Sequence, residues 1–197
     1  MVTLGYLGIS LFALWVLSEV VIVLISLRNR SGVSSKGADR FSYFMVWVST
    51  VPPLGLEYLL RVHPIFGEGF GSFSTLFPLL GYLGCFVFAL GITMRLVAVA
   101  TLHRYFTVSV SILEKHAIVD TGIYGIIRHP SYLGYLASML GIGLMFGNWV
   151  GLAVLVLLPL ASILYRIHVE ERVLLHHFGA SYQAYAKRTK RLLPGIW

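Results

Sequence analysis

Residues 131–165 read SYLGYLASMLGIGLMFGNWVGLAVLVLLPLASILY, and this stretch decides the fold. It holds two apolar runs, 131–146 and 149–165, and neither contains a charged residue. Only Gly147-Asn148 separates them. A break this short favours an antiparallel helical hairpin. The hairpin would bring the residues that precede it close to the residues that follow it.

The composition of the whole chain points to a membrane protein. Of its 197 residues, 57% are hydrophobic and only 12% are charged, whereas roughly 25% of a soluble domain is charged. A soluble globule of this size could not bury so much apolar surface. The single cysteine, Cys85, excludes a disulfide scaffold, and the 20 glycines follow no collagen-like repeat. We therefore expect an integral membrane protein.

Three more apolar runs precede the hairpin: residues 4–27, 41–60 and 73–100. A hydrocarbon core of about 30 Å needs about 20 apolar residues per helix, so each run is long enough to cross. No Lys or Arg precedes Arg28, so the first run lacks the basic start of a signal peptide and is expected to stay in the membrane. The sequence predicts an all-α membrane fold with five transmembrane helices, three of them within residues 1–100.

The basic residues indicate how this fold is oriented. With five spans, fourteen of the fifteen Lys and Arg residues fall on one side of the membrane, and only Arg61 falls on the other. Basic residues collect on the cytoplasmic side, so we expect the N-terminus outside and the C-terminus in the cytosol. This rule also accounts for the net charge of +7 without a nucleic-acid partner. Glu19 and Arg95 lie at similar depth and are expected to pair.

Two polar segments flank the hairpin, residues 101–130 before it and residues 166–197 after it. Because the hairpin returns its ends to one side, Arg128, His129 and Tyr132 should come close to Arg166 and Glu170. Two segments that are distant in sequence would then form the walls of one pocket at the cytosolic surface of the membrane.

Both polar segments carry short motifs in a fixed order. The first segment and the start of the hairpin contain His116-Ala117-Ile118-Val119, Gly122-Ile123-Tyr124 and Arg128-His129-Pro130-Ser131-Tyr132. The second segment contains Arg166, Glu170-Glu171, Phe178-Gly179, Tyr182 and Tyr185. This ordered set resembles the signature of isoprenylcysteine carboxyl methyltransferases and their prokaryotic relatives. The resemblance covers residues 102–197 and makes residues 101–197 a methyltransferase-like catalytic region.

The resemblance implies S-adenosylmethionine as methyl donor, with S-adenosylhomocysteine as product. It implies that these residues line the cofactor site: Ser109, His116, Ala117, Ile118, Val119, Tyr124, His129, Pro130, Ser131, Tyr132 and Glu170. Ser109 stands where the eukaryotic members carry a glutamine that touches the cofactor. Arg166 would face a lipophilic acceptor reached from the bilayer. That acceptor is a prenylated cysteine carboxylate or another lipid-like molecule, such as an alkyl-pyrone hydroxyl or an amine headgroup.

The types of these residues suit the chemistry. The carboxylate of Glu170 accepts hydrogen bonds from both hydroxyls of a ribose, and the rings of Tyr124 and Tyr132 attract a sulfonium cation. Arg166 is always charged and could hold one oxygen of an acceptor carboxylate. His129 is the first base to test if the acceptor must lose a proton.

Other interpretations remain open from sequence alone. A membrane-bound NADPH-dependent steroid or enone reductase has a similar C-terminal layout, although no arginine cluster beyond Arg166 and Arg172 would hold a nicotinamide phosphate. A small transporter or a non-enzymatic interaction protein is a further alternative. Against transport, the sequence contains no inverted repeat of the kind common in transporters. The histidine spacings match no common zinc pattern, so no metal is expected. Tyr182 and Tyr185 are expected to be interfacial anchors, and the oligomeric state stays open.

Overall fold

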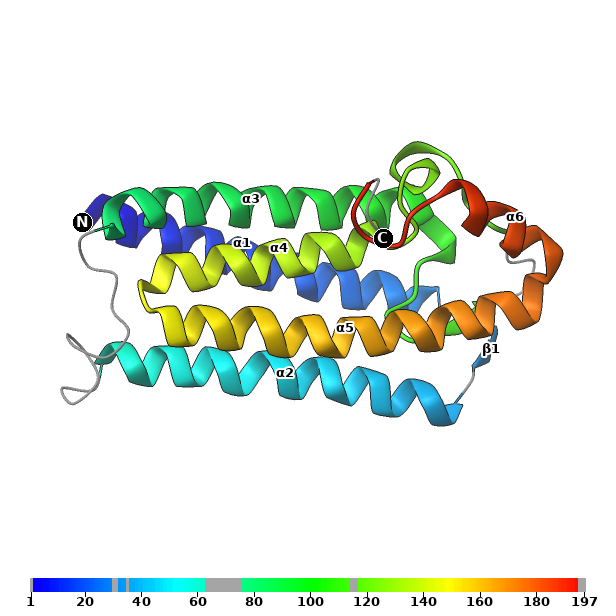
Figure 1. Ribbon diagram of the computed structural model, residues 1–197, viewed down its shortest axis with the longest axis horizontal. Coiled ribbons are helices and arrows are strands. Elements are labelled where there is room, and N and C mark those ends of the chain that lie inside the picture. Colours follow the sequence, from blue (N-terminus) through cyan, green and yellow to red (C-terminus); the bar gives the residue numbers. More distant parts are fainter. Residues whose placement is uncertain (1, 30–31, 35, 63–75, 114–116, 195–197) are drawn as a thin grey trace.

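The computed structural model is a bundle of long helices lying side by side, and it describes residues 2–29, 32–34, 36–62, 76–113 and 117–194 (Figure 1). The long helices are α1 (Val2–Arg28), α2 (Lys36–Val62), α3 (Phe77–Leu102), α4 (Pro130–Phe146) and α5 (Trp149–Phe178). One end of the bundle carries the hairpin turn. The opposite end carries the smaller elements, which are the strands β1 (Gly32–Ser34) and β2 (Ser111–Leu113), the 3-10 helices η1 (His103–Tyr105) and η2 (Gly122–Gly125), and α6 (Ala180–Arg188).

The predicted hairpin is confirmed, and two residues explain its tight turn. Gly147 ends α4 with φ at +81°, in the left-handed region that glycine adopts without strain. Asn148 caps α5, because its Oδ1 accepts from the backbone nitrogens of Val150 at 2.8 Å and Gly151 at 3.2 Å. The helices α4 and α5 then run back along each other.

Two helices are longer than the apolar runs that predicted them. α2 begins at Lys36 rather than at residue 41, and α5 continues to Phe178 rather than ending near residue 165. No glycine or proline lies between residues 160 and 178, so nothing breaks α5 before Gly179, which has φ at +52°. Arg166 and Glu170 therefore lie on a rigid helix and not in a tail.

Three helices of the described part of the chain are long and apolar enough to cross a membrane, namely α1, α3 and α5. α4 is apolar but has only 17 residues. Large apolar side chains such as Ile9, Phe86 and Leu157 point outward and are mostly exposed, as expected for a surface in contact with lipid. The chain is an integral membrane protein. The predicted number of five crossings stays a prediction.

Close contact between α3 and α4 forms the rigid centre of the bundle. Gly84 and Gly91 on α3 are seven residues apart, as are Gly134 and Gly141 on α4, and the two pairs face each other. Small residues of this kind let membrane helices approach until their backbones touch. A buried cluster that includes Phe88 of α3 surrounds the contact.

We expect Gly141→Ala to destabilise the protein by about 2 kcal/mol, because overpacking a close contact typically costs about 1–3 kcal/mol. A methyl group at position 141 would lie 2.5 Å from the backbone nitrogen of Phe88 and 2.7 Å from the carbonyl oxygen of Gly84. Thermal unfolding of the purified protein in detergent measures the effect. Gly55→Ala is the matched control, since a methyl group there meets nothing within 4 Å. Equal melting temperatures for the two variants would contradict this account of the packing.

A short antiparallel pair of strands joins two loops that the sequence treats separately. Gly32 of β1 pairs with Leu113 of β2, and Ser34 pairs with Ser111. The segment after α1 thus lies beside the segment that leads to the hairpin. The apolar pattern gave no indication of this pairing, because each strand has only three residues.

Candidate active site

The segments on either side of the hairpin meet at the end of the bundle that carries α6. Tyr132, in the first turn of α4, donates from its hydroxyl to Oε2 of Glu170 at 2.5 Å. Arg166 donates from Nε to the same hydroxyl at 2.9 Å. His129 stacks on the Tyr132 ring with centroids 5.5 Å apart. The prediction that the hairpin brings these residues together is confirmed.

Glu171 holds the two segments together beneath this group. Its Oε1 accepts from Nε of Arg128 at 2.8 Å, and its Oε2 accepts from Nε of Arg191 at 2.8 Å. Nε2 of His129 lies 3.4 Å from the same Oε1. Glu171 does not line the cavity, whereas the neighbouring Glu170 does. The two adjacent carboxylates therefore have different surroundings, one among cations and one facing the cavity.

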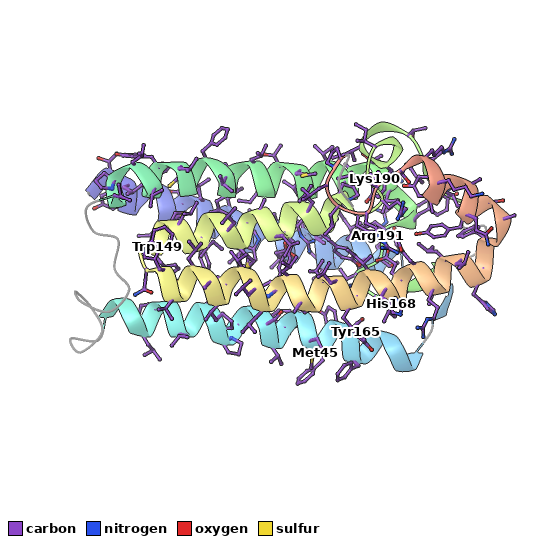
Figure 2. The ribbon with its side chains drawn as sticks, in the orientation of Figure 1. Met45, Trp149, Tyr165, His168, Lys190 and Arg191 are labelled. Atoms are coloured by element: carbon purple, nitrogen blue, oxygen red, sulfur yellow. The ribbon has the colours of Figure 1, made fainter. Side chains whose placement is uncertain are left out.

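The segment after α6 closes over the start of α4. The backbone nitrogen of Arg128 donates to the carbonyl of Lys190 at 2.7 Å, and that of His129 donates to the carbonyl of Arg191 at 3.0 Å. Figure 2 shows Lys190 and Arg191 at the same end of the bundle as α6, opposite the end where Trp149 begins α5. Backbone pairing thus fixes the residues of the Arg-His-Pro-Ser-Tyr motif.

Arg166 joins three parts of the chain. Besides Tyr132, its guanidinium donates to Oγ of Ser42 on α2 at 3.1 Å and to the carbonyl oxygen of Val108. The segment around Val108 is also fixed by α1, since the Val108 nitrogen donates to Oγ of Ser26 at 2.8 Å. Only 4% of Arg166 is exposed. This arginine is therefore held by the protein in one orientation.

A single cavity of about 600 Å³ lies against these residues. Ten of the residues implied by the resemblance line it: Ser109, Ala117, Ile118, Val119, Tyr124, His129, Ser131, Tyr132, Arg166 and Glu170. Pro130 is buried at the start of α4 and does not line the cavity. His116 lies outside the described residues. Residues from four separate stretches of sequence thus surround one space.

The cavity also extends between α1 and α2, which the sequence motifs did not suggest. Apolar side chains line this part, among them Val20 and Leu24 of α1 and Val46 and Val51 of α2. Contacts between these two helices are sparse, because α1 packs on α3 and α2 packs on α5. An apolar space between poorly packed helices suits a hydrocarbon chain rather than a polar ligand.

An ion pair forms part of the cavity wall. Arg95 donates from Nε to Oε1 of Glu19 at 2.5 Å and from Nη2 to Oε2 at 2.8 Å. Arg95 also donates from Nη1 to Oγ of Ser131 at 3.0 Å. The predicted pairing of Glu19 with Arg95 is confirmed. The pair links α1 to α3 and, through Ser131, to the start of α4.

The prediction that Tyr182 and Tyr185 are interfacial anchors is wrong. Both side chains are buried and line the cavity. Tyr185 donates from its hydroxyl to the carbonyl of Tyr124 at 2.8 Å, so α6 packs against η2. Their three-residue spacing places both on one face of a helix, but the partner of Tyr185 lies about sixty residues earlier and cannot be identified from local sequence.

Burial controls the protonation of the tyrosines outside the membrane helices. It raises the pKa of Tyr185 to about 12 and the pKa of Tyr124 well above its usual value. Burial also raises the pKa of Tyr182, with smaller contributions from the charges of Glu171 and Glu170. These phenols stay neutral at physiological pH, and Tyr185 acts as a hydrogen-bond donor. Among the described residues, no three His, Cys, Asp or Glu side chains are grouped to hold a metal ion.

Comparison with known proteins finds similarity to one family. The sequence model of the isoprenylcysteine carboxyl methyltransferase (ICMT) family matches residues 82–176. This match begins within α3, earlier than the motifs suggested, and ends before α6.

Named relatives agree with this match. The protein-S-isoprenylcysteine O-methyltransferase of Saccharomyces cerevisiae is 32% identical over 127 residues, which cover 64% of this chain and 53% of the yeast protein. Protein-S-isoprenylcysteine O-methyltransferase B of Arabidopsis thaliana is 34% identical over 115 residues, covering 57% of this chain and 58% of the plant protein. The chain therefore spans little more than half the length of these relatives.

A solved structure shares the fold. The structure of the eukaryotic intramembrane Ras methyltransferase ICMT aligns with a TM-score of 0.58 and 22% sequence identity, covering 96% of this chain and 68% of the other. The similarity therefore extends beyond the matched motifs to α1 and α2. Together with the family match and the named relatives, it leads to one conclusion. The chain is similar to the isoprenylcysteine carboxyl methyltransferase family over residues 82–176, and it shares the fold of a solved member.

Proposed function

We propose that this chain is an S-adenosylmethionine-dependent methyltransferase that methylates a lipophilic acceptor within the membrane. The acceptor is most simply the carboxylate of a prenylated cysteine or of a related lipid-like molecule. One observation carries the proposal: a single cavity joins the polar residues of the family signature to an apolar space between α1 and α2. A reaction between a polar cofactor and a lipid needs both environments next to each other.

The residues around the polar part of the cavity fit the cofactor. A volume of about 600 Å³ falls within the roughly 300–1,000 Å³ of small-molecule sites. Glu170 offers a carboxylate for a pair of ribose hydroxyls, and it retains acceptor capacity beside its bond to Tyr132. The rings of Tyr124 and Tyr132 supply aromatic walls. When bound, the cofactor supplies an electrophilic methyl group on a sulfonium.

The chain's own residues would bring the acceptor to that group. Arg166 is fixed by Ser42, Tyr132 and the Val108 carbonyl, so its guanidinium is oriented before the acceptor arrives. A carboxylate held there by one oxygen presents the other for attack. Because such an acceptor is already ionised at pH 7, most of the rate enhancement would come from placement and from exclusion of water.

His129 has a different role for this kind of acceptor. Its ring is buried on the face of Tyr132, and its two nitrogens lie 3.8 Å from Glu170 and 3.4 Å from Glu171. In these surroundings it fixes the Tyr132 ring. For a phenol or enol acceptor, which must lose a proton, His129 would be the base.

The proposal includes an arrangement in the membrane. The chain would cross five times, with the N-terminus outside and the signature residues at the cytosolic surface, following the distribution of Lys and Arg. The acceptor's hydrocarbon tail would enter from the bilayer between α1 and α2. Its polar end would then reach Arg166 without leaving the protein–lipid boundary.

The test combines binding with methyl transfer. We expect purified protein to bind S-adenosylhomocysteine in calorimetry, and Glu170→Gln to weaken this affinity by about 10- to 100-fold, because bonds to a charged group contribute about 1.5–3 kcal/mol. Labelled S-adenosylmethionine should transfer its methyl group to a lipid extract that contains prenylated cysteine. Arg172→Gln is the control, since Arg172 lies on the exposed side of α5 and, among the residues that the structure describes, bonds to His168.

Two results would contradict the proposal. Absence of S-adenosylhomocysteine binding by the wild type would exclude the methyltransferase assignment. Consumption of NADPH by membranes containing the wild type, without methyl transfer, would instead support the reductase alternative.

A further inference from the structure

Two serines connect Arg166 to the two helices that border the apolar part of the cavity. On α2, Oγ of Ser42 accepts from Nη1 of Arg166 at 3.1 Å. On α1, Oγ of Ser26 accepts from the backbone nitrogen of Val108 at 2.8 Å, and the carbonyl of Val108 accepts from Nη2 of Arg166. Arg166 is thus connected to α2 directly and to α1 through the backbone of one residue.

The segment around Val108 is attached to α1 at more than one point. Besides the serine bond, Nδ2 of Asn29, at the end of α1, donates to the carbonyls of His103 and Phe106 at 3.0 Å each. Phe106 is buried in one cluster with Ile22 of α1. A change in the position of α1 would therefore move the Val108 carbonyl, and with it one of the contacts that orient the guanidinium.

The helices α1 and α2 have few contacts with each other, because α1 packs on α3 and α2 packs on α5. Apolar side chains such as Leu24 of α1 and Val46 of α2 line the space between them. Ser26 follows Leu24 by two residues and Ser42 precedes Val46 by four, so both serines lie at the end of this space that is nearer to Arg166. The spacing of α1 and α2 depends on what fills the space, and the serines connect that spacing to Arg166.

Neither serine belongs to the cavity wall. Ser42 is fully buried, only 6% of Ser26 is exposed, and neither side chain lines the cavity. A substitution at either position would therefore reach a bound ligand through the protein. These are positioning residues rather than catalytic residues.

We infer that Ser26 and Ser42 transmit the seating of the acceptor's hydrocarbon chain between α1 and α2 to the guanidinium of Arg166. The inference rests on the proposed function, because it takes the lipophilic acceptor and the role of Arg166 from there. A chain that fills the space sets the helix spacing at which both contacts orient the guanidinium towards the acceptor carboxylate. Binding energy from the remote chain then appears in the rate of transfer and not only in the affinity for the acceptor. Hydrogen bonds between rigid helices are one means of carrying such coupling.

The first test compares N-acetylcysteine acceptors that carry an S-geranyl or a longer S-farnesyl chain, with labelled S-adenosylmethionine as donor. In the wild type we expect the farnesyl acceptor to have the higher kcat as well as the lower KM. Ser42→Ala should lower kcat for this acceptor by about tenfold, the effect of one lost bond to a charged group, and should remove most of the difference in kcat between the two acceptors. Ser26→Ala should act in the same way with a loss of about threefold, because its bond joins neutral groups. Both variants should bind S-adenosylhomocysteine within about twofold of the wild-type affinity, since their effect falls on the acceptor.

Two other serines of α1 and α2 are matched controls. Ser18 on α1 donates to the carbonyl of Trp15 within its own helix at 2.7 Å. Ser49, two turns along α2 from Ser42, bonds to Oγ of Ser162 on α5 at 2.8 Å. Ser18 and Ser49 are buried and do not line the cavity. Ser18→Ala and Ser49→Ala should keep the wild-type difference in kcat between the two acceptors, although Ser49→Ala also loses a bond between α2 and α5.

A double variant tests whether Ser42 acts through Arg166. Adding Ser42→Ala to Arg166→Met should lower kcat no further, because the single Arg166→Met variant already has no guanidinium to orient. Losses that multiply would show that the serine acts by another route, and would overturn the inference.

The remaining results separate the possible errors. A wild type that distinguishes the two acceptors in KM alone would overturn the inference, and so would serine variants that keep the wild-type difference in kcat or a Ser49→Ala control that loses it. These results leave the proposed function intact. A wild type that binds S-adenosylhomocysteine but methylates neither acceptor would overturn the assigned acceptor together with this inference, and a wild type that binds none would overturn the proposed function as a whole.

Discussion

Glu171→Ala should lower the stability of the ligand-free protein by about 3 kcal/mol, which corresponds to about 6–12 °C in melting temperature for a chain of this size. The substitution removes the carboxylate that pairs with both Arg128 and Arg191. Arg128 is only 9% exposed in its side chain, so its charge would be left almost buried without a counter-ion. Arg191 is more exposed, at 38%, and solvent screening reduces its share.

The neighbouring carboxylate provides the control for this result. Glu170→Ala removes the same group one position earlier but leaves Arg128 and Arg191 paired with Glu171. We expect it to change the melting temperature of the ligand-free protein much less while it impairs binding of S-adenosylhomocysteine. If the two alanine variants melt at the same temperature, Glu171 is not the structural member of the pair.

An exposed ion pair gives a second comparison. Asp120 and Arg188 also pair at this end of the molecule, but their side chains are 38% and 62% exposed. Pairs this exposed contribute about 0–1 kcal/mol. Asp120→Ala should therefore have little effect on melting, so a large drop with Glu171→Ala would reflect burial rather than the number of ion pairs.

The features that the sequence predicted correctly are local or follow from polarity. The Gly147-Asn148 turn predicted the hairpin because glycine and asparagine are the residues that a tight turn and a helix cap require. The pairing of Glu19 with Arg95 followed from their similar depth, since charges in a membrane pair with each other. The meeting of Tyr132 with Glu170 followed from the hairpin alone.

The features that the sequence did not predict depend on contacts between distant segments. The polar character of residues 166–178 suggested a tail, yet polarity does not end a helix, and α5 continues to Gly179. Tyr182 and Tyr185 suggested anchors because aromatic residues near charges are common at membrane surfaces. Their burial depends on η2, which packs against α6 from about sixty residues away. The apolar part of the cavity arises because α1 and α2 pack on different neighbours.

Arg166→Lys should reduce methyl transfer by at least about 100-fold, comparable to the loss of an oriented donor in other active sites. The guanidinium of Arg166 bonds in three directions, to Tyr132, Ser42 and the Val108 carbonyl. An ammonium group is a compact charge and cannot reproduce that planar arrangement. The charge remains in the variant, so the loss would measure orientation and not attraction alone.

The affinity for S-adenosylhomocysteine tells whether Arg166 acts on the acceptor or on the cofactor. We expect the affinity of Arg166→Lys for S-adenosylhomocysteine to stay within about threefold of the wild-type value, because Glu170 and Tyr132 remain. A contact that is lost only with the acceptor does not change the affinity for the cofactor. Arg172→Lys, on the same helix and bonded to His168 at the surface, should retain full transfer. If the affinity falls in parallel with transfer, Arg166 acts by holding Tyr132 for the cofactor, and its assignment to the acceptor is wrong.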